Sequence, residues 1–180
     1  MKILFYYHSI SMGGQQSQIL SLCKEFSTLG HECFWAYDSG TDLIHNFEKY
    51  GRTEKLKTID NGIKTRFNFF TRVVRLAANT ATRIMSIKKI LKIRSVDLII
   101  TSDSYGSLIC GLSGVGICTR QFRLIGQDIE RLEHPWFKLY NILRIDKFVT
   151  IYFGWPLVYD SLAAKGISKD KFADFPSNAV

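Results

Sequence analysis

The chain lacks the features that mark several large classes of protein. It has only 3 prolines in 180 residues, and no run approaches the roughly 18 consecutive apolar residues of a membrane-spanning helix. No secretory signal is expected, because His8 interrupts the short apolar run that follows Lys2. With 46% apolar and 22% charged residues, the composition excludes disorder, collagen-like repeats and low complexity. We therefore expect a globular, cytoplasmic protein.

Metal-binding and disulfide patterns are also missing. No C-x-x-C pair occurs, and the histidines are scattered; the residues concerned are Cys23, Cys33, Cys110, Cys118, His8, His31, His45 and His134. A structural zinc site needs four ligands at motif spacing. The sequence therefore predicts reduced cysteines among apolar neighbours, and no metal site.

Acidic residues are missing from one long segment. No Asp or Glu lies between Asp60 and Asp97, but nine basic residues do: Lys64, Arg66, Arg72, Arg75, Arg83, Lys88, Lys89, Lys92 and Arg94. Of the formal net charge of +8, this segment carries +9 and the rest of the chain −1. The basic character of the protein therefore belongs to this segment.

Three interpretations of the basic segment remain open. Its apolar positions, among them Val73, Val74, Ile87 and Leu91, predict a helix over 67–93. Basic and apolar residues side by side on a helix suit an anionic membrane surface, with Arg66, Arg72, Arg75, Lys88 and Lys89 as candidate contacts. The alternatives are a core-packed helix with a solvated basic face, and nucleic-acid binding, which no accompanying motif supports.

Strand-like and helix-like segments alternate along the whole chain. We expect strands at 2–8, 33–37, 56–59, 96–101, 122–126, 147–152 and 171–175, and helices at 15–29, 43–50, 67–93, 105–115, 136–143 and 156–165. Gly30 and Gly166 are the expected stops of two of the helices. This order predicts one α/β domain over 1–180, with a Rossmann-like, doubly wound parallel sheet.

A loop with paired glycines follows the first predicted strand. Ligands of open α/β sheets bind beyond the carboxyl ends of the strands. Gly13 and Gly14 stand there, directly before a helix, where free amides favour an anion such as phosphate. A tight turn that needs positive φ is the alternative. Neither the dinucleotide fingerprint nor the P-loop fingerprint is met.

Other polar residues follow later strands. Asp103 could accept a hydrogen bond from a sugar hydroxyl, or it could cap the helix that follows. Gln127, Asp128 and Glu130 place an amide and two carboxylates after another strand. Acid–base catalysis needs carboxylates that converge on one reacting atom, and a solvated loop is the alternative. Together with Ser11, these residues are the candidates for substrate binding.

The order of these elements resembles the first domain of family 4 retaining glycosyltransferases of the GT-B type. Residues 1–37 show the family's apolar strand, Gly-Gly loop and helix, followed by Gly-His-Glu before the second strand. The likeness continues in order through residues 95–100, 148–166 and 177–180, the last resembling the Asn-Gly-Val element at the start of the second domain. Residues 127–130 resemble a variant of some rhamnosyltransferase-like members.

The resemblance implies the acceptor-binding, N-terminal half of a GT-B enzyme, without its C-terminal nucleotide-sugar domain. Such an enzyme transfers a hexosyl or rhamnosyl group with retained configuration, and this half alone would be inactive. The acceptor would be a glycan or a lipid-linked glycan of cell-surface polysaccharide synthesis. The donor is a co-substrate, and this domain would hold no cofactor of its own. Many members work at the inner membrane face, which implies a peripheral location there.

The same resemblance suggests roles for single residues. Gly13 and Gly14 would face the donor diphosphate through backbone amides. Gln127 and Asp103 stand at or near positions where relatives often have His, and no catalytic residue is assigned. Two rival functions remain. The first is a nucleotide-sugar epimerase of the same architecture, which would need titratable groups gathered in the cleft between its two domains. The second is a stand-alone, non-catalytic module that would bind a membrane surface or a ligand.

Overall fold

The computed structural model describes residues 1–7, 14–38, 44–56, 69–101, 104–114, 120–125, 142–143, 149–154, 159–160, 163–164, 166 and 168–174. The strands are β1 (Lys2–Tyr7), β2 (Glu32–Tyr37), β3 (Arg52–Lys55), β4 (Leu98–Thr101), β5 (Arg120–Ile125), β6 (Val149–Gly154) and β7 (Phe172–Asp174). The helices are α1 (Gly14–Thr28), α2 (Ile44–Glu48), α3 (Phe69–Arg94), α4 (Ser104–Gly114) and a 3-10 turn at Lys169–Lys171.

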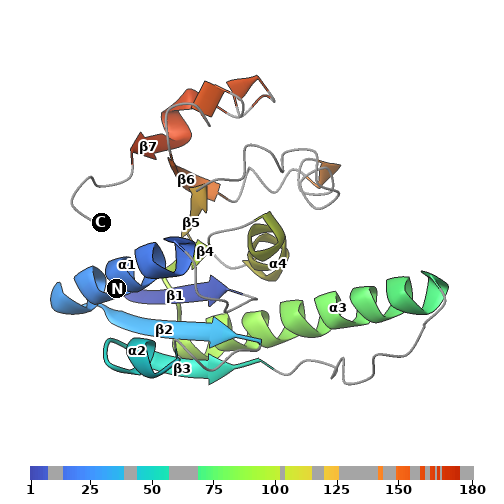
Figure 1. Cartoon of the computed structure of the whole chain (residues 1–180), viewed down its shortest axis with the longest axis horizontal. Helices are drawn as coiled ribbons and strands as arrows, with labels where there is room; N and C mark the ends of the chain where they lie inside the picture. The colour runs from blue at the N-terminus through green and yellow to red at the C-terminus, as the bar shows by residue number, and fades with distance from the viewer. Residues whose placement is uncertain are drawn as a thin grey trace.

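The strands form one parallel sheet in the order β3-β2-β1-β4-β5-β6-β7. From β1 the chain steps outward first to one edge of the sheet and then to the other (Figure 1). Sheets of this order place their ligand crevice at the carboxyl end, where the direction reverses between β1 and β4. The predicted Rossmann-like, doubly wound α/β fold is confirmed.

Both faces of the sheet are buried, which is why its central strands are almost wholly apolar. Along β1, Ile3 and Phe5 join one core cluster with residues of α1 and α2. Leu4 and Tyr6 point to the other face, where they pack with Ile87 of α3 and residues of α4. These four β1 side chains are fully buried.

Helix α1 ends where the sequence predicts. Gly30 adopts a φ of 78°, and its N–H donates to the carbonyl of Ser27. The N–H of His31 donates to the carbonyl of Phe26, which completes a Schellman motif. The centres of the Phe26 and His31 rings lie 5.7 Å apart, so the side chains at the two ends of this hydrogen bond pack against each other.

Strand β3 differs from the prediction. It occupies Arg52–Lys55, four residues before the expected strand at 56–59, and Leu56 lies buried directly after it. An edge strand with one neighbour needs no alternating apolar pattern, and its charged side chains discourage pairing with other sheets. The remaining described strands and helices lie within about two residues of prediction, and the expected helices at 136–143 and 156–165 lie mostly outside the described residues.

A close backbone contact supports β3. A Cβ at Gly51 would lie 2.6 Å from the carbonyl oxygen of Cys33 in β2, a backbone atom that cannot move alone. We expect Gly51→Ala to lower the free energy of unfolding by about 1–3 kcal/mol through this overpacking. Urea denaturation measures the change, with exposed Lys49→Ala as control, for which a change within about 0.5 kcal/mol is expected. Equal stabilities would show that the contact relaxes without cost.

Candidate functional site

A buried polar cluster lies at the carboxyl edge of the sheet, on the face covered by α3 and α4. We call it the strand-end cluster; its members are Tyr6, Asp38, Thr80, Arg83, Thr101 and Tyr105. Asp38 directly follows β2 and is only 3% exposed. Because side chains alternate along a strand, Asp38 lies on the same face as Phe34, which packs toward α3 and α4.

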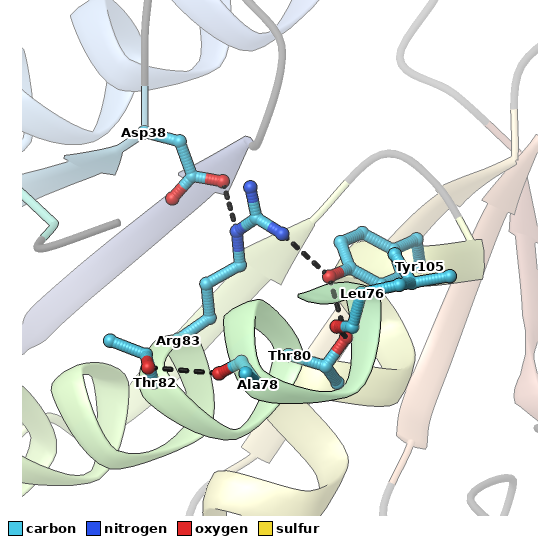
Figure 2. A network of polar contacts seen from close by, with 7 residues as sticks. All are labelled: Asp38, Leu76, Ala78, Thr80, Thr82, Arg83 and Tyr105. Atoms are coloured by element: carbon cyan, nitrogen blue, oxygen red, sulfur yellow. Dashed lines mark hydrogen bonds and ion pairs between the residues drawn. The ribbon is translucent and has the colours of Figure 1, made fainter. Parts of the chain in front are cut away.

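Arg83 is the centre of the cluster and bridges three elements. Its Nε donates to Oδ2 of Asp38 at 2.5 Å, and its Nη1 donates to the hydroxyl of Tyr105 at 2.8 Å (Figure 2). The Tyr105 hydroxyl also lies 3.0 Å from Oγ1 of Thr80, one turn before Arg83 in α3. The guanidinium carbon lies 5.5 Å from the centre of the Tyr105 ring. Helix α3 is thereby fixed to the end of β2 and to the start of α4.

The electrostatics of the cluster keep both Arg83 and Tyr6 protonated. Burial lowers the pKa of Arg83, but Asp38 and the two tyrosines outweigh it, so that this pKa is raised. Burial raises the pKa of the Tyr6 phenol, and the negative charge of Asp38 raises it further. Neither group exchanges a proton near neutral pH. Within the cluster they can donate hydrogen bonds and hold charge, but they cannot act as general bases.

Two hydroxyls of the cluster have no hydrogen-bond partner among the described residues. They are the Tyr6 hydroxyl and Oγ1 of Thr101, and both side chains are at most 1% exposed. Tyr6 and Thr101 are paired across β1 and β4, so the two lie side by side on neighbouring strands. A buried polar group without a partner costs about 1–3 kcal/mol, and such groups usually bind water or a ligand. The cluster therefore has hydrogen-bonding capacity left at the strand ends.

We find neither a metal site nor a membrane span in the part of the chain that the structure describes. It contains no group of three or more His, Cys, Asp or Glu side chains able to hold a metal. None of its helices is both long and apolar enough to cross a bilayer. Cys23, Cys33 and Cys110 are buried thiols, as predicted, whereas Cys118 lies outside the described residues.

The structure tests few of the predicted site residues. Gly14 is the first residue of α1. Outside the described residues lie Ser11, Gly13, Asp103, Gln127, Asp128, Glu130 and Arg66. Their predicted roles therefore stay predictions.

The remaining candidates lie on α3. The backbone of Arg72 belongs to the helix, but its side chain is not among those described. Arg75 is half-buried, whereas Lys88 and Lys89 are exposed. These positions fit a basic outer face, and a membrane contact remains a prediction.

The sequence analysis missed Asp38 and Arg83 as site residues, although signals for both were present. Asp38 directly follows a predicted strand, and Asp103 lies two residues after another. Arg83 is one of the nine basic residues of the segment, yet it lies one turn before Ile87 on the apolar stripe of its helix. A charged residue on such a stripe needs a buried partner. Which carboxylate it meets, 45 residues away, depends on the tertiary fold.

Comparison with known proteins supports the fold. No family model and no curated protein matches the chain. Among solved structures, Anabaena Alr3699/HepE in complex with UDP and glucose matches 97% of this chain at 12% identity, with a TM-score of 0.68. The lipopolysaccharide outer core galactosyltransferase WaaB matches 96% at 16% identity, with a TM-score of 0.62. UDP-GlcNAc 2-epimerase from Methanocaldococcus jannaschii matches 97% at 12% identity, with a TM-score of 0.62.

The matches cover only part of each neighbour. The chain spans only 43%, 44% and 45% of the three neighbours' lengths, although nearly all of it is matched. At such low identities the likeness shows the fold alone. The fold is the Rossmann-like α/β fold of the N-terminal halves of GT-B glycosyltransferase structures.

Proposed function

We propose that this chain is the acceptor-side, N-terminal half of a glycosyltransferase that uses a nucleotide sugar. The observation that carries the proposal is the match of 97% of the chain to less than half of a sugar-nucleotide protein, HepE with UDP and glucose. A half of this kind has its ligand crevice at the carboxyl edge of its sheet. In our structure that edge carries the strand-end cluster.

The donor in this proposal is a nucleoside-diphosphate hexose or rhamnose, and UDP-glucose is the first to test. The start of α1 suits the diphosphate, because the first N–H groups of a helix have no intrahelical partner and its dipole favours negative charge. The first turn of α1 contains no Asp or Glu that would compete for these groups. Gly13 and Gly14, from the preceding loop, would let the diphosphate approach the backbone.

The acceptor in this proposal is a glycan or a lipid-linked glycan of cell-surface polysaccharide synthesis. The unpartnered hydroxyls of Tyr6 and Thr101 support this proposal, because they could still bond to polar groups through water. We further propose that transfer retains the anomeric configuration, as the resemblance to family 4 implies. NMR of the first-formed product identifies the anomer, and an inverted product would refute this part alone.

A second candidate is epimerisation of a nucleotide sugar. It is favoured by the matches to UDP-GlcNAc 2-epimerases from Methanocaldococcus jannaschii and Rickettsia bellii, with TM-scores of 0.62 and 0.64. Against it, the one carboxylate of the strand-end cluster, Asp38, is paired with Arg83, whereas proton transfer in an epimerase needs a group that can exchange a proton. Incubation with UDP-GlcNAc and no acceptor separates the two: a new epimer indicates the epimerase.

The proposal predicts what the gene encodes beyond Val180. We expect the open reading frame to continue for a domain-sized stretch of alternating strands and helices with an E-x7-E pair, in keeping with neighbours of which this chain covers about 43%. Sequencing the coding DNA checks this. The protein encoded by that frame should then consume a nucleotide sugar when an acceptor is present, whereas residues 1–180 alone should not. A stop codon after Val180 would instead favour a stand-alone binding module.

A further inference from the structure

We propose that the outward face of α3 docks on an anionic membrane surface. The outward face is the side turned away from the sheet, and its members are Val74, Ala81, Met85, Lys88, Lys89, Lys92 and Ile93. The opposite side of the same helix carries Ile87 and Leu91, which are at most 1% exposed. The proposal rests on this surface alone and holds whichever sugar reaction the protein performs.

The outward face is more apolar than a solvated helix face should be. Met85 is 64% exposed, Ile93 63% and Val74 50%. A surface helix that packs on a sheet normally places polar residues on its outer side. Single exposed apolar residues need no explanation, but here three large ones share one face with three lysines and Ala81. That pairing is typical of helices that lie in a membrane interface.

The charges on this face are of one sign and belong to the surface. Lys88, Lys89 and Lys92 are exposed and make no ion pair with any described residue. Helix α3 contains no Asp or Glu. Two other basic residues of the helix turn inward instead. Arg83 pairs with Asp38, and Arg94 pairs with Glu54 at 2.5 Å, so their charges are balanced within the protein.

The placement of α3 leaves this face accessible. The helix has 26 residues, which corresponds to roughly 39 Å. Figure 1 shows its N-terminal end reaching past the arrowheads of β1, β2 and β3. Val73 and Leu76 in that end are 46% and 43% exposed, although they continue the stripe that packs further along the helix. The projecting end thus adds apolar surface next to the outward face.

A bilayer with anionic lipids complements both properties. Lysines attract acidic headgroups over about a Debye length, and the Met85, Val74 and Ile93 side chains can enter the boundary between headgroups and acyl chains. A soluble acidic partner would pair with the lysines. It would not offer the apolar side chains the hydrocarbon environment that a bilayer supplies. The mixed surface therefore favours a membrane over nucleic acid, which would also be drawn to the lysines.

Vesicle co-sedimentation of the protein as its gene encodes it tests the proposal. The wild type should bind vesicles of phosphatidylcholine mixed with phosphatidylglycerol, but not vesicles of phosphatidylcholine alone. The triple variant Lys88→Gln, Lys89→Gln, Lys92→Gln should bind about 100-fold more weakly at low salt, since each basic residue near an anionic surface contributes about fivefold. A second variant, Met85→Trp, should show blue-shifted fluorescence on the mixed vesicles.

A matched control tests whether the loss of binding is specific to the lysines of α3. The triple variant Lys24→Gln, Lys49→Gln, Lys55→Gln removes the same charge from exposed positions outside α3 and should bind as the wild type does. Equal losses in both triple variants, equal binding to both vesicle types, or no binding at all would overturn the proposal. So would binding to a DNA duplex without binding to vesicles. No sugar or acceptor enters this assay, so its failure leaves the proposed function untouched.

Discussion

Replacing Arg83 by methionine is expected to lower the free energy of unfolding by about 3–5 kcal/mol, because it removes the arginine partner of a buried carboxylate. Asp38 is only 3% exposed, and the Arg83 side chain only 13%. Methionine keeps the length of the side chain but supplies no donor to Oδ2 of Asp38 or to the Tyr105 hydroxyl. Urea denaturation, followed by circular dichroism, measures the change.

Two further variants separate the buried charge from the other contacts. Combining Arg83→Met with Asp38→Asn also removes the buried negative charge, so the double variant should recover part of the loss. Tyr105→Phe deletes one hydroxyl that accepts from Arg83 and contacts Thr80, and it should cost only about 0.5–1.5 kcal/mol. If Arg83→Met alone were as stable as the wild type, the ion pair would not hold α3 in place.

This pair matters for function because of what it connects. Asp38 ends β2, Arg83 lies mid-way along α3, and Tyr105 lies in the first turn of α4. Loosening it would let α3 shift relative to the strand ends that form the crevice. The same helix carries the outward face proposed to meet the membrane. One buried ion pair therefore links the orientation of α3 to that of the strand ends.

The core of the fold could be predicted from the sequence because local signals and tertiary demands agree there. The run that forms β1 is apolar on both faces, and the structure buries it on both faces. Helix α1 shows apolar spacing of three and four residues and ends at Gly30, where a positive φ is needed. These patterns occupy a few consecutive residues and depend little on distant partners.

The edge of the sheet and the strand-end cluster could not be predicted so well, since both depend on long-range contacts. The charged residues Arg52 and Glu54 lie in β3 because the outer edge of β2 is free to pair with them. Their sequence has no alternating apolar pattern that would predict a strand. The partnership of Arg83 with Asp38 arises only once α3 packs across the sheet. The sequence gives the net charge of the basic segment, but it does not show which of the basic side chains pair with carboxylates inside the protein.

In the complete enzyme, Gly14→Val is expected to lower kcat/KM for sugar transfer by about 100-fold or more, the scale on which loss of one hydrogen-bond donor to a developing negative charge slows acyl-transfer enzymes. Gly14 is the first residue of α1, where N–H groups have no intrahelical partner. A branched side chain there would stand between these amides and the donor diphosphate. Steady-state kinetics with the nucleotide sugar measures the loss, which rests on the proposed function.

The control for this variant places the same side chain one turn further into the helix. Ser17 is exposed in α1, and Ser17→Val should leave kcat/KM within a few-fold of the wild type. Thermal melting of both variants shows whether the fold persists, since valine in a helix costs only about 0.7 kcal/mol or less relative to alanine. A folded Gly14→Val enzyme with full activity would mean that the glycines only make a turn and that the diphosphate binds elsewhere. A folded but inactive one, beside an active Ser17→Val, would place the donor at the start of α1.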